Sequence, residues 1–178
     1  SSDLLIVQKY NARPARYEGP GKISLSPLLI DLTLKDGIED MIAEALQKEV
    51  KLPCGGRIII EETRACTAID VDSGEDRGHG SISHLNEEAA VEIARQIRLR
   101  NIAGKIVIDF AGSSEYKFIK PVLDILAQEL AHDRNKGRLF GLSRAGNVEI
   151  IRVRRRPSLS SLLTKECEVC HGSGRVEK

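Results

Sequence analysis

Three aspartates lie where apolar segments of the sequence end, and this placement points to metal chemistry. Asp70 and Asp72 end the apolar run of residues 66–71, and Asp109 lies near the end of a second run, residues 105–110. Alternate side chains of a strand share a face, so Asp70 and Asp72 are expected to project together. Carboxylate oxygens are hard ligands that suit Mg²⁺ or Mn²⁺. The three aspartates are therefore candidates for a divalent-metal site.

The segments around these aspartates predict how they are brought together. Residues 57–61 and 66–71 are β-branched or apolar runs joined by a turn, which predicts a hairpin. Residues 86–100 carry a helical apolar period and precede the third strand. A strand, helix and strand in this order usually place the two strands parallel, with their carboxyl ends at one edge. Asp109 is then expected close to the other two aspartates, although spacing alone leaves open that each is only a turn former or helix cap.

The remaining periodicities complete an α/β protein. Residues 36–50 and 115–134 show helical apolar periods. Ser114 can cap the second of these helices, and Pro121 predicts a local irregularity within it. Residues 138–142 and 148–153 predict a second hairpin. These segments together predict a sheet that is covered by helices.

The composition is that of an ordinary globular domain. Of 178 residues, 41% are hydrophobic and 30% are charged, and no stretch has the length of a membrane span or the pattern of a signal peptide. We therefore expect a cytosolic protein without a membrane span. Aromatic residues are scarce, with no Trp and three each of Phe and Tyr, which argues against a base-stacking platform in this chain.

Basic residues are balanced over the whole chain but concentrated in its last third. Lys and Arg total 27 against 26 Asp and Glu, so the net charge does not indicate a polyanionic partner. Arg152 and Arg154 alternate with Ile151 and Val153, which fits a solvated sheet face as well as a phosphate-binding one. The locally basic residues are Arg134, Lys136, Arg138, Arg144, Arg152, Arg154, Arg155 and Arg156.

Two of the four cysteines form a Cys-x-x-Cys motif. Cys167 and Cys170 are followed by glycines, as in one half of a zinc knuckle. Structural zinc takes four ligands, so either His171 and another residue contribute, or two chains each supply a pair across a symmetric interface. A redox dithiol is the competing interpretation, although its usual place is the start of a helix in a thioredoxin-like unit.

Several blocks of the sequence together resemble one known family. They are L-P-C-G-G-R-I-I-I-E-E-T-R-A-C-T-A-I-D-V-D-S-G, L-N-E-E-A-A-V-E-I-A-R-Q-I-R-L-R-N-I-A-G-K-I-V-I-D-F, L-S-R-A-G-N-V-E-I, R-P-S-L and C-E-V-C-H-G-S-G. In order and spacing they resemble the ribonuclease E/G family over about residues 50–174. The resemblance implies an α/β fold, with a mixed β-sheet flanked by helices in a DNase-I-like subdomain and a C-terminal zinc-link segment.

The same resemblance implies a domain organisation. Residues 1–30 are expected to be a remnant of an amino-terminal RNA-binding domain or an edge hairpin, residues 31–156 the catalytic subdomain, and residues 157–178 a linker with the zinc-link. Because the family normally carries an RNA-binding OB-fold domain and a 5′-end-sensing region, the chain is expected to be either a fragment or a short form.

The function implied by the resemblance is an endoribonuclease of RNA processing and decay. It would use Mg²⁺ to cut single-stranded AU-rich RNA and leave a 5′-phosphate on the downstream product. Asp70 and Asp109 match the residues that hold the metal, and Asp72 matches a residue, usually Asn, that orients one of them. Cys167 and Cys170 match a pair that shares Zn²⁺ with a neighbouring protomer, which implies a homodimer or higher homo-oligomer. The residues expected along the RNA path are Lys136, Arg144, Arg152 and Arg154. The alternative is a non-catalytic RNA-binding or scaffold module.

Overall fold

The computed structural model describes residues 37–74, 81–112, 115–170, 172 and 174. The chain divides into two compact units, residues 1–45 and residues 46–178, which are described separately. The described part of the first unit contains the helix α3 (Ile38–Ala45). The helix predicted over residues 36–50 is therefore right in type but too long. Residues 49–51 instead belong to a strand of the second unit, where Val50 packs against the core.

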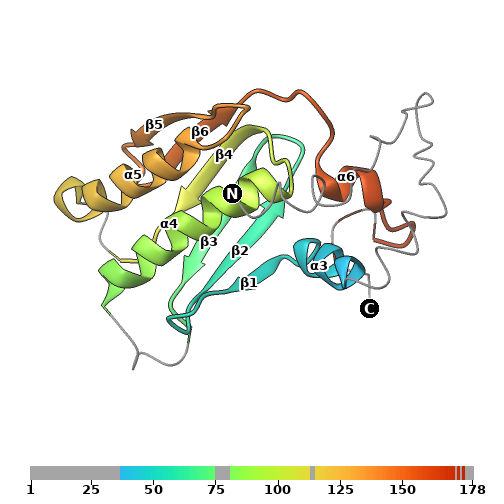
Figure 1. The fold of residues 1–178 in the computed structure, drawn as a ribbon, viewed down its shortest axis with the longest axis horizontal. Helices are drawn as coiled ribbons and strands as arrows, with labels where there is room; N and C mark the ends of the chain where they lie inside the picture. The colour runs from blue at the N-terminus through green and yellow to red at the C-terminus, as the bar shows by residue number, and fades with distance from the viewer. Residues whose placement is uncertain (1–36, 75–80, 113–114, 171, 173, 175–178) are drawn as a thin grey trace. The chain divides into compact units, whose positions relative to one another are not determined.

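Six strands in the described part of the second unit form one mixed sheet (Figure 1). They lie in the order β1-β2-β3-β4-β6-β5. β3 and β4 are parallel, and all other neighbouring strands are antiparallel, which confirms the predicted crossover and both predicted hairpins. The strands are β1 (Glu49–Lys51), β2 (Arg57–Glu62), β3 (Thr67–Asp72), β4 (Gly104–Asp109), β5 (Arg138–Leu142) and β6 (Val148–Arg152).

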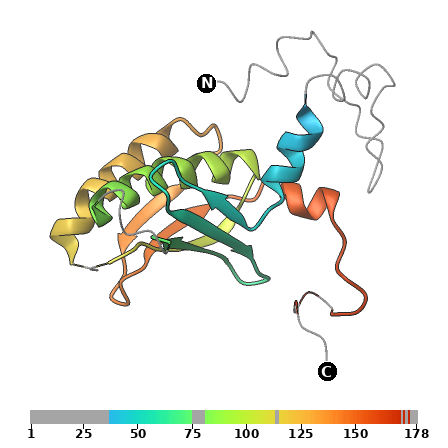
Figure 2. The same cartoon turned by 90° about the horizontal axis from the view of Figure 1, so that it is seen from below.

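Two long helices, α4 (Ile82–Leu99) and α5 (Tyr116–Ala131), lie on the same face of this sheet (Figure 2). α4 connects β3 to β4 and begins four residues before the predicted start. It begins there because the Ser81 side chain accepts a hydrogen bond from the His84 N–H and so caps the helix. α5 continues as an α-helix through Pro121. Its predicted cap, Ser114, lies outside the described residues.

The core lies between these helices and the sheet. Ile93 and Ile97 of α4 and Leu126 of α5 are fully buried against Ile69 and Ile106 of the strands. Each such side chain contributes about 1.5–3 kcal/mol of burial free energy, which fixes the positions of the helices on the sheet. Among the described helices, none is long and apolar enough to cross a membrane.

The opposite face of the sheet is covered by neither α4 nor α5, and we call it the open face. Burial alternates along each strand, so that Ile69 and Val71 are buried while Ala68 and Asp70 between them are exposed. The same alternation applies to the neighbouring strands. The open face therefore carries Arg57, Ile59, Glu61, Ala68, Asp70, Lys105, Val107, Asp109, Glu149 and Ile151.

The segment after β6, predicted as a linker, is attached to the domain through a short helix. α6 (Leu159–Leu163) follows Ser158, whose hydroxyl accepts a hydrogen bond from the Ser161 N–H. The Leu159 N–H donates to the Arg100 carbonyl at 2.8 Å, and the Ser160 hydroxyl donates to Glu62 at 2.7 Å. These contacts fix the point from which the Cys-x-x-Cys segment leaves the domain.

Candidate active site

The structure brings Asp70 and Asp109 together at one edge of the open face. The two residues are register partners in the parallel pair of β3 and β4, as the crossover predicted. Parallel strands lie about 4.8 Å apart, so the two carboxylates leave the sheet side by side. They line a pocket of about 270 Å³ on this face. The other lining residues are Ile59, Glu61, Ala68, Ile69, Val107 and Asn147.

The pocket is electrostatically prepared for a cation. Partial burial raises the pKa of Asp70 above its usual range, and the negative charges of Asp109 and Asp72 raise it further. Two neighbouring carboxylates that repel each other are stabilised by a positive ion between them. Mg²⁺ commonly uses one or two protein carboxylates and keeps waters or substrate phosphates as its other ligands. The donor set of Asp70 and Asp109 therefore fits Mg²⁺.

Asp72, the third predicted aspartate, has a different environment. The Arg57 Nη2 atom donates to Asp72 Oδ2 at 2.6 Å, and the Gly74 N–H donates to Asp72 Oδ1 at 2.9 Å. The hydrogen bond from Gly74 and then those from Arg57 hold the pKa of Asp72 below its usual range. Within the described ranges, no three His, Cys, Asp or Glu side chains are arranged to hold one metal ion. The sequence predicted a group of three carboxylates. The structure instead pairs Asp70 with Asp109 and binds Asp72 to an arginine.

The backbone just after Asp109 is held by a residue that sequence reasoning did not select. The Asn86 side chain donates to the Ala111 carbonyl at 2.9 Å and accepts from the Ala111 N–H at 3.1 Å. Asn86 lies in α4 and is 6% exposed. This double hydrogen bond ties the end of β4 to the helix that covers the core. The sequence signal for this role is a polar residue, Asn86, on the apolar face of a predicted helix. The same residue is equally typical of the start of a helix, so the signal does not identify its role.

The turn between β5 and β6 reaches the same edge of the sheet. Ile108 of β4 pairs with Val148 of β6, so residues 143–147 lie beside the end of β4. The turn is closed by the Ser143 N–H, which donates to the Asn147 carbonyl, and by the Asn147 N–H, which donates to the Ser143 hydroxyl. Asn147, which was not predicted, lines the pocket, and the predicted Arg144 is exposed in the same turn.

The other three predicted RNA contacts lie at the far end of the sheet. Gly104 at the start of β4 pairs with Arg152, and Arg154 donates to the Ala103 carbonyl just before that strand. Lys136 precedes β5 at the same end. A six-residue strand places this end about 17 Å from Asp109. The structure therefore groups Arg144 with the aspartates and separates Lys136, Arg152 and Arg154 from them.

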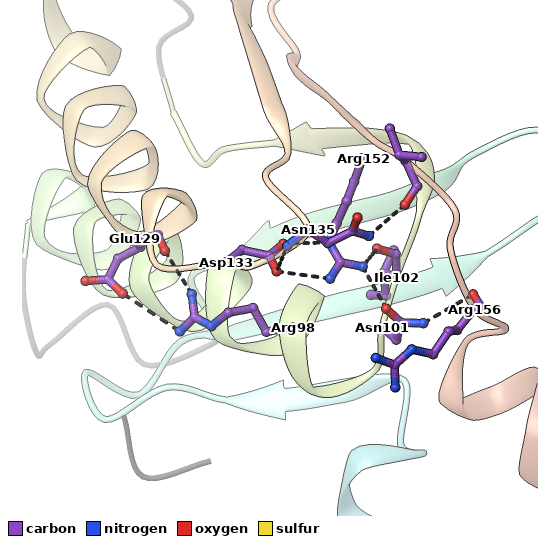
Figure 3. Close-up of polar contacts among 9 residues, drawn as sticks. Arg98, Asn101, Ile102, Glu129, Asp133, Asn135, Arg152 and Arg156 are labelled. Carbon is purple, nitrogen blue, oxygen red and sulfur yellow. Dashed lines mark hydrogen bonds and ion pairs between the residues drawn. The ribbon is translucent and has the colours of Figure 1, made fainter. Parts of the chain in front are cut away.

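Arg152 is moreover buried, which argues against its predicted contact with RNA. It is 4% exposed, and its Nε atom donates to Asp133 Oδ2 at 2.6 Å. Its Nη1 atom donates to the Asn101 side chain and to the Ile102 carbonyl (Figure 3). Arg152 therefore joins β6 to the loops after α4 and α5, and its donors are used inside the protein. The prediction is corrected to a structural role for this residue.

Cys167 and Cys170 lie in a turn of the C-terminal segment. Cys167 is exposed and Cys170 is half-buried. Hydrogen bonds from the Cys170 and Val169 N–H groups lower the pKa of the Cys167 thiol, and the Cys170 side chain adds to this effect. One half of a zinc knuckle likewise directs backbone amides toward its thiolates. The thiol groups of Cys167 and Cys170 are therefore suitable ligands for Zn²⁺. His171, the other suggested ligand, lies outside the described residues.

Comparison with known proteins shows which proteins this chain resembles. Residues 13–155 match the model of the Ribonuclease E/G family. Ribonuclease G of Escherichia coli K12 is 41% identical over 144 residues, which are 79% of this chain and 29% of that protein. Ribonuclease G of Haemophilus influenzae is 41% identical over 145 residues, 79% of this chain and 30% of that protein. Ribonuclease E of E. coli K12 is 37% identical over 177 residues, 97% of this chain and 17% of that protein. The chain thus spans less than a third of the length of these relatives.

Proposed function

Because the chain belongs to the ribonuclease E/G family, we propose that it is an endoribonuclease whose active site is the pocket around Asp70 and Asp109. One observation supports this proposal above the others. Two carboxylates from parallel strands project side by side from the open face, and their mutual repulsion favours a bound cation. Formation of the fold does not require two aspartates at these paired positions, because their carboxylates repel each other.

Asp70 and Asp109 would hold Mg²⁺, the metal to which their donor set is suited. A magnesium ion held there would supply a water of lowered pKa and positive charge to offset the charge that develops on the phosphate. The protein's own contribution is positional. Asn86 fixes the backbone two residues beyond Asp109, and the pair of Arg57 and Asp72 fixes the end of β3. Each group limits the movement of one metal-binding strand end.

The turn between β5 and β6 supplies groups that can bind the substrate. Arg144 is exposed in this turn and carries a guanidinium that suits phosphate oxygens. The Asn147 amide lines the pocket and can donate a hydrogen bond to a phosphate oxygen or accept one from a water. Contacts of this kind bind the RNA backbone without reading its sequence and become weaker as salt increases.

The finer features of the proposal follow from the family resemblance. We propose single-stranded AU-rich RNA as substrate, a 5′-phosphate on the downstream product, and a role in RNA processing and decay in the cytoplasm. We also propose that Cys167 and Cys170 share a structural Zn²⁺ with the same pair of a second protomer, because two thiolates provide half of a tetrahedral site. Zinc would then connect two copies of the chain.

The test is cleavage of a fluorescent AU-rich single-stranded oligonucleotide with Mg²⁺ or with a chelator. The wild-type chain is expected to cut only with Mg²⁺, and Asp70→Asn and Asp109→Asn are each expected to lose cleavage. Asp124→Asn is the matched control, because Asp124 is an exposed aspartate that pairs with Lys120 on α5. Asp70→Asn should fold at least as stably as wild type, since it removes a repulsive charge.

The possible results separate the proposal from its alternative. Cleavage by Asp109→Asn at the wild-type rate would exclude the assigned site. RNA binding by the wild type without any cleavage would instead indicate a non-catalytic RNA-binding module.

A further inference from the structure

A half-exposed phenylalanine lies on the open face of the sheet, close to the proposed active site. Phe140 of β5 is 52% exposed. The register of β5 against β6 shifts between Leu139 and Gly141, so Phe140 is the extra residue of a β-bulge. Bulges redirect side chains and occur often beside active sites. Gly141 has a φ of 88°, which a residue with a side chain would adopt only with strain.

The strand register places Phe140 relative to the metal-binding aspartates. Gly141, its neighbour, pairs with Glu149 of β6, and Glu149 pairs with Val107 of β4. Val107 itself lines the pocket that contains Asp109. Two strand spacings and two residues along β4 give a separation on the order of 12 Å between Phe140 and Asp109. At about 3.4 Å per stacked nucleotide, this is a span of no more than about four nucleotides.

The charges around this ring suit a nucleic acid. The Arg138 guanidinium lies 4.8 Å from the centre of the Phe140 ring. Arginine guanidinium planes and phenylalanine rings both stack on unpaired bases, and the cation also attracts the phosphate backbone. Glu149 is exposed on the same face and repels phosphate, so the sugar-phosphate chain is expected to run on the Arg138 side of the ring.

We propose that Phe140 and Arg138 form a base-stacking subsite for single-stranded RNA, which binds a nucleotide a few positions from the scissile phosphate. This inference rests on the proposed ribonuclease function and adds to it a binding site on the open face. The occupant is an unpaired base, because Phe140 offers an aromatic ring with the Arg138 guanidinium against it, and because this surface continues the face on which the carboxylates lie. The scarcity of aromatic residues argues against an extended stacking platform, whereas one ring is enough to stack one base. A base-paired segment would not present a free base face to the ring. The subsite would help the enzyme to select single-stranded RNA.

The test compares two phenylalanines with similar surroundings. Phe118 of α5 is 56% exposed and has the Lys117 ammonium 4.6 Å from its ring centre, but it lies on a helix of the other layer. Phe140→Ala and the control Phe118→Ala are measured alongside wild type for binding of a fluorescein-labelled AU-rich oligonucleotide in chelator, by anisotropy. Cleavage with Mg²⁺ gives kcat and KM for the same RNA. Phe140→Tyr keeps a ring at the same position and serves as the conservative variant.

Phe140→Ala is expected to weaken RNA binding and to raise KM by about 5- to 20-fold, the lower part of the range for loss of one base stack. The kcat should change little, and Phe118→Ala and Phe140→Tyr should stay within about twofold of wild type. A series of oligonucleotides with one abasic site each, placed around the cut position, locates the stacked base. For one position of the abasic site, wild type and Phe140→Ala should bind the RNA with equal affinity, because the base that stacks on the ring is already missing.

Results that would refute the stacking subsite can be distinguished from results that would refute the proposed nuclease function. If Phe140→Ala binds and cuts RNA as well as wild type, or if Phe118→Ala is weakened equally, the subsite is excluded while the nuclease assignment stands. If no abasic position removes the effect of Phe140→Ala, the ring does not stack on a base and the inference is wrong. If the wild type neither binds nor cuts RNA, both the subsite and the proposed function are wrong.

Discussion

Replacement of Asn86 by leucine tests whether the backbone after Asp109 must be held in place. Leucine has the same branching and number of side-chain heavy atoms but is apolar, so Asn86→Leu removes both hydrogen bonds to Ala111 without opening a cavity. Each hydrogen bond contributes about 0.5–1.5 kcal/mol net, and a partly buried Ala111 amide left without a partner costs more. We therefore expect a loss of about 2–3 kcal/mol in the free energy of unfolding. Urea titration followed by circular dichroism measures this value.

Catalysis should respond to Asn86→Leu more strongly than stability does. Ala111 follows Asp109 by two residues, so release of its backbone lets the carboxylate that we propose to hold Mg²⁺ move, and a displacement of about 1 Å can cost about 10²-fold in rate. The expected result is a lower kcat and a higher Mg²⁺ concentration for half-maximal cleavage, measured where the variant is fully folded. Its cause would be positional, because Asn86 is buried in α4 and has no route to the RNA.

Asn135→Leu is the matched control for this experiment. The Asn135 side chain donates to the Val153 carbonyl at 2.7 Å, at the end of the sheet away from Asp109. Its replacement should cost about 1 kcal/mol of stability and leave the Mg²⁺ requirement unchanged. A folded Asn86→Leu variant with wild-type kcat and wild-type Mg²⁺ dependence would refute the positional role of Asn86.

Two further predictions concern acid stability and zinc. Burial would raise the pKa of Asp133, but hydrogen bonds from Arg152 and from the Asn135 N–H outweigh it and lower the pKa below its usual range. The stability from this ionised group is present above its unfolded pKa of about 3.9 and is lost as pH falls through the lower folded value. Asp133→Asn should therefore lower the free energy of unfolding by about 3 kcal/mol near neutral pH, because it leaves Arg152 buried without its partner. As the pH falls, the urea midpoint of the variant should decrease less than that of wild type. Equal decreases for the two proteins would contradict this prediction. Cys167→Ser, like chelation of zinc, should halve the mass of the assembly in light scattering, whereas an unchanged mass would exclude a zinc-bridged dimer.

The parts of the fold that follow from local pattern could be predicted from the sequence. The alternation around Asp70 and the helical period after it were sufficient to predict parallel strands with Asp109 at the same edge, and the register confirms this proximity. The predicted helix over residues 36–50 was too long, because propensity does not show where the chain joins the edge of a sheet. That outcome depends on the contact of Val50 with a core formed by distant residues.

The burial of Arg152 illustrates what a strand period cannot decide. Alternation assigned Arg152 and Arg154 to one face and Ile151 to the other, but it did not show which face the helices cover. In the structure Ile151 is 45% exposed and Arg152 is buried, because Asp133 beyond α5 supplies a carboxylate inside the protein. The exposed ring of Phe140 is similar, since the strand period puts Phe140 on the same face as Arg138 but does not show that the helices leave this face uncovered.

The aspartate at position 72 shows how a charge near the candidate site is balanced. The family resemblance predicts an uncharged asparagine there, so that Asp72 would be expected to add a third negative charge beside Asp70 and Asp109. Arg57 lies opposite Asp72 in the antiparallel pair and bonds its carboxylate through two nitrogens. Because this guanidinium offsets part of the added charge, Asp109 contributes more than Asp72 to the charge repulsion that raises the pKa of Asp70. Glu61 also lines the pocket, but Asp70 and Asp109 are the carboxylates that the parallel register places side by side, and this pair is the donor set that suits Mg²⁺.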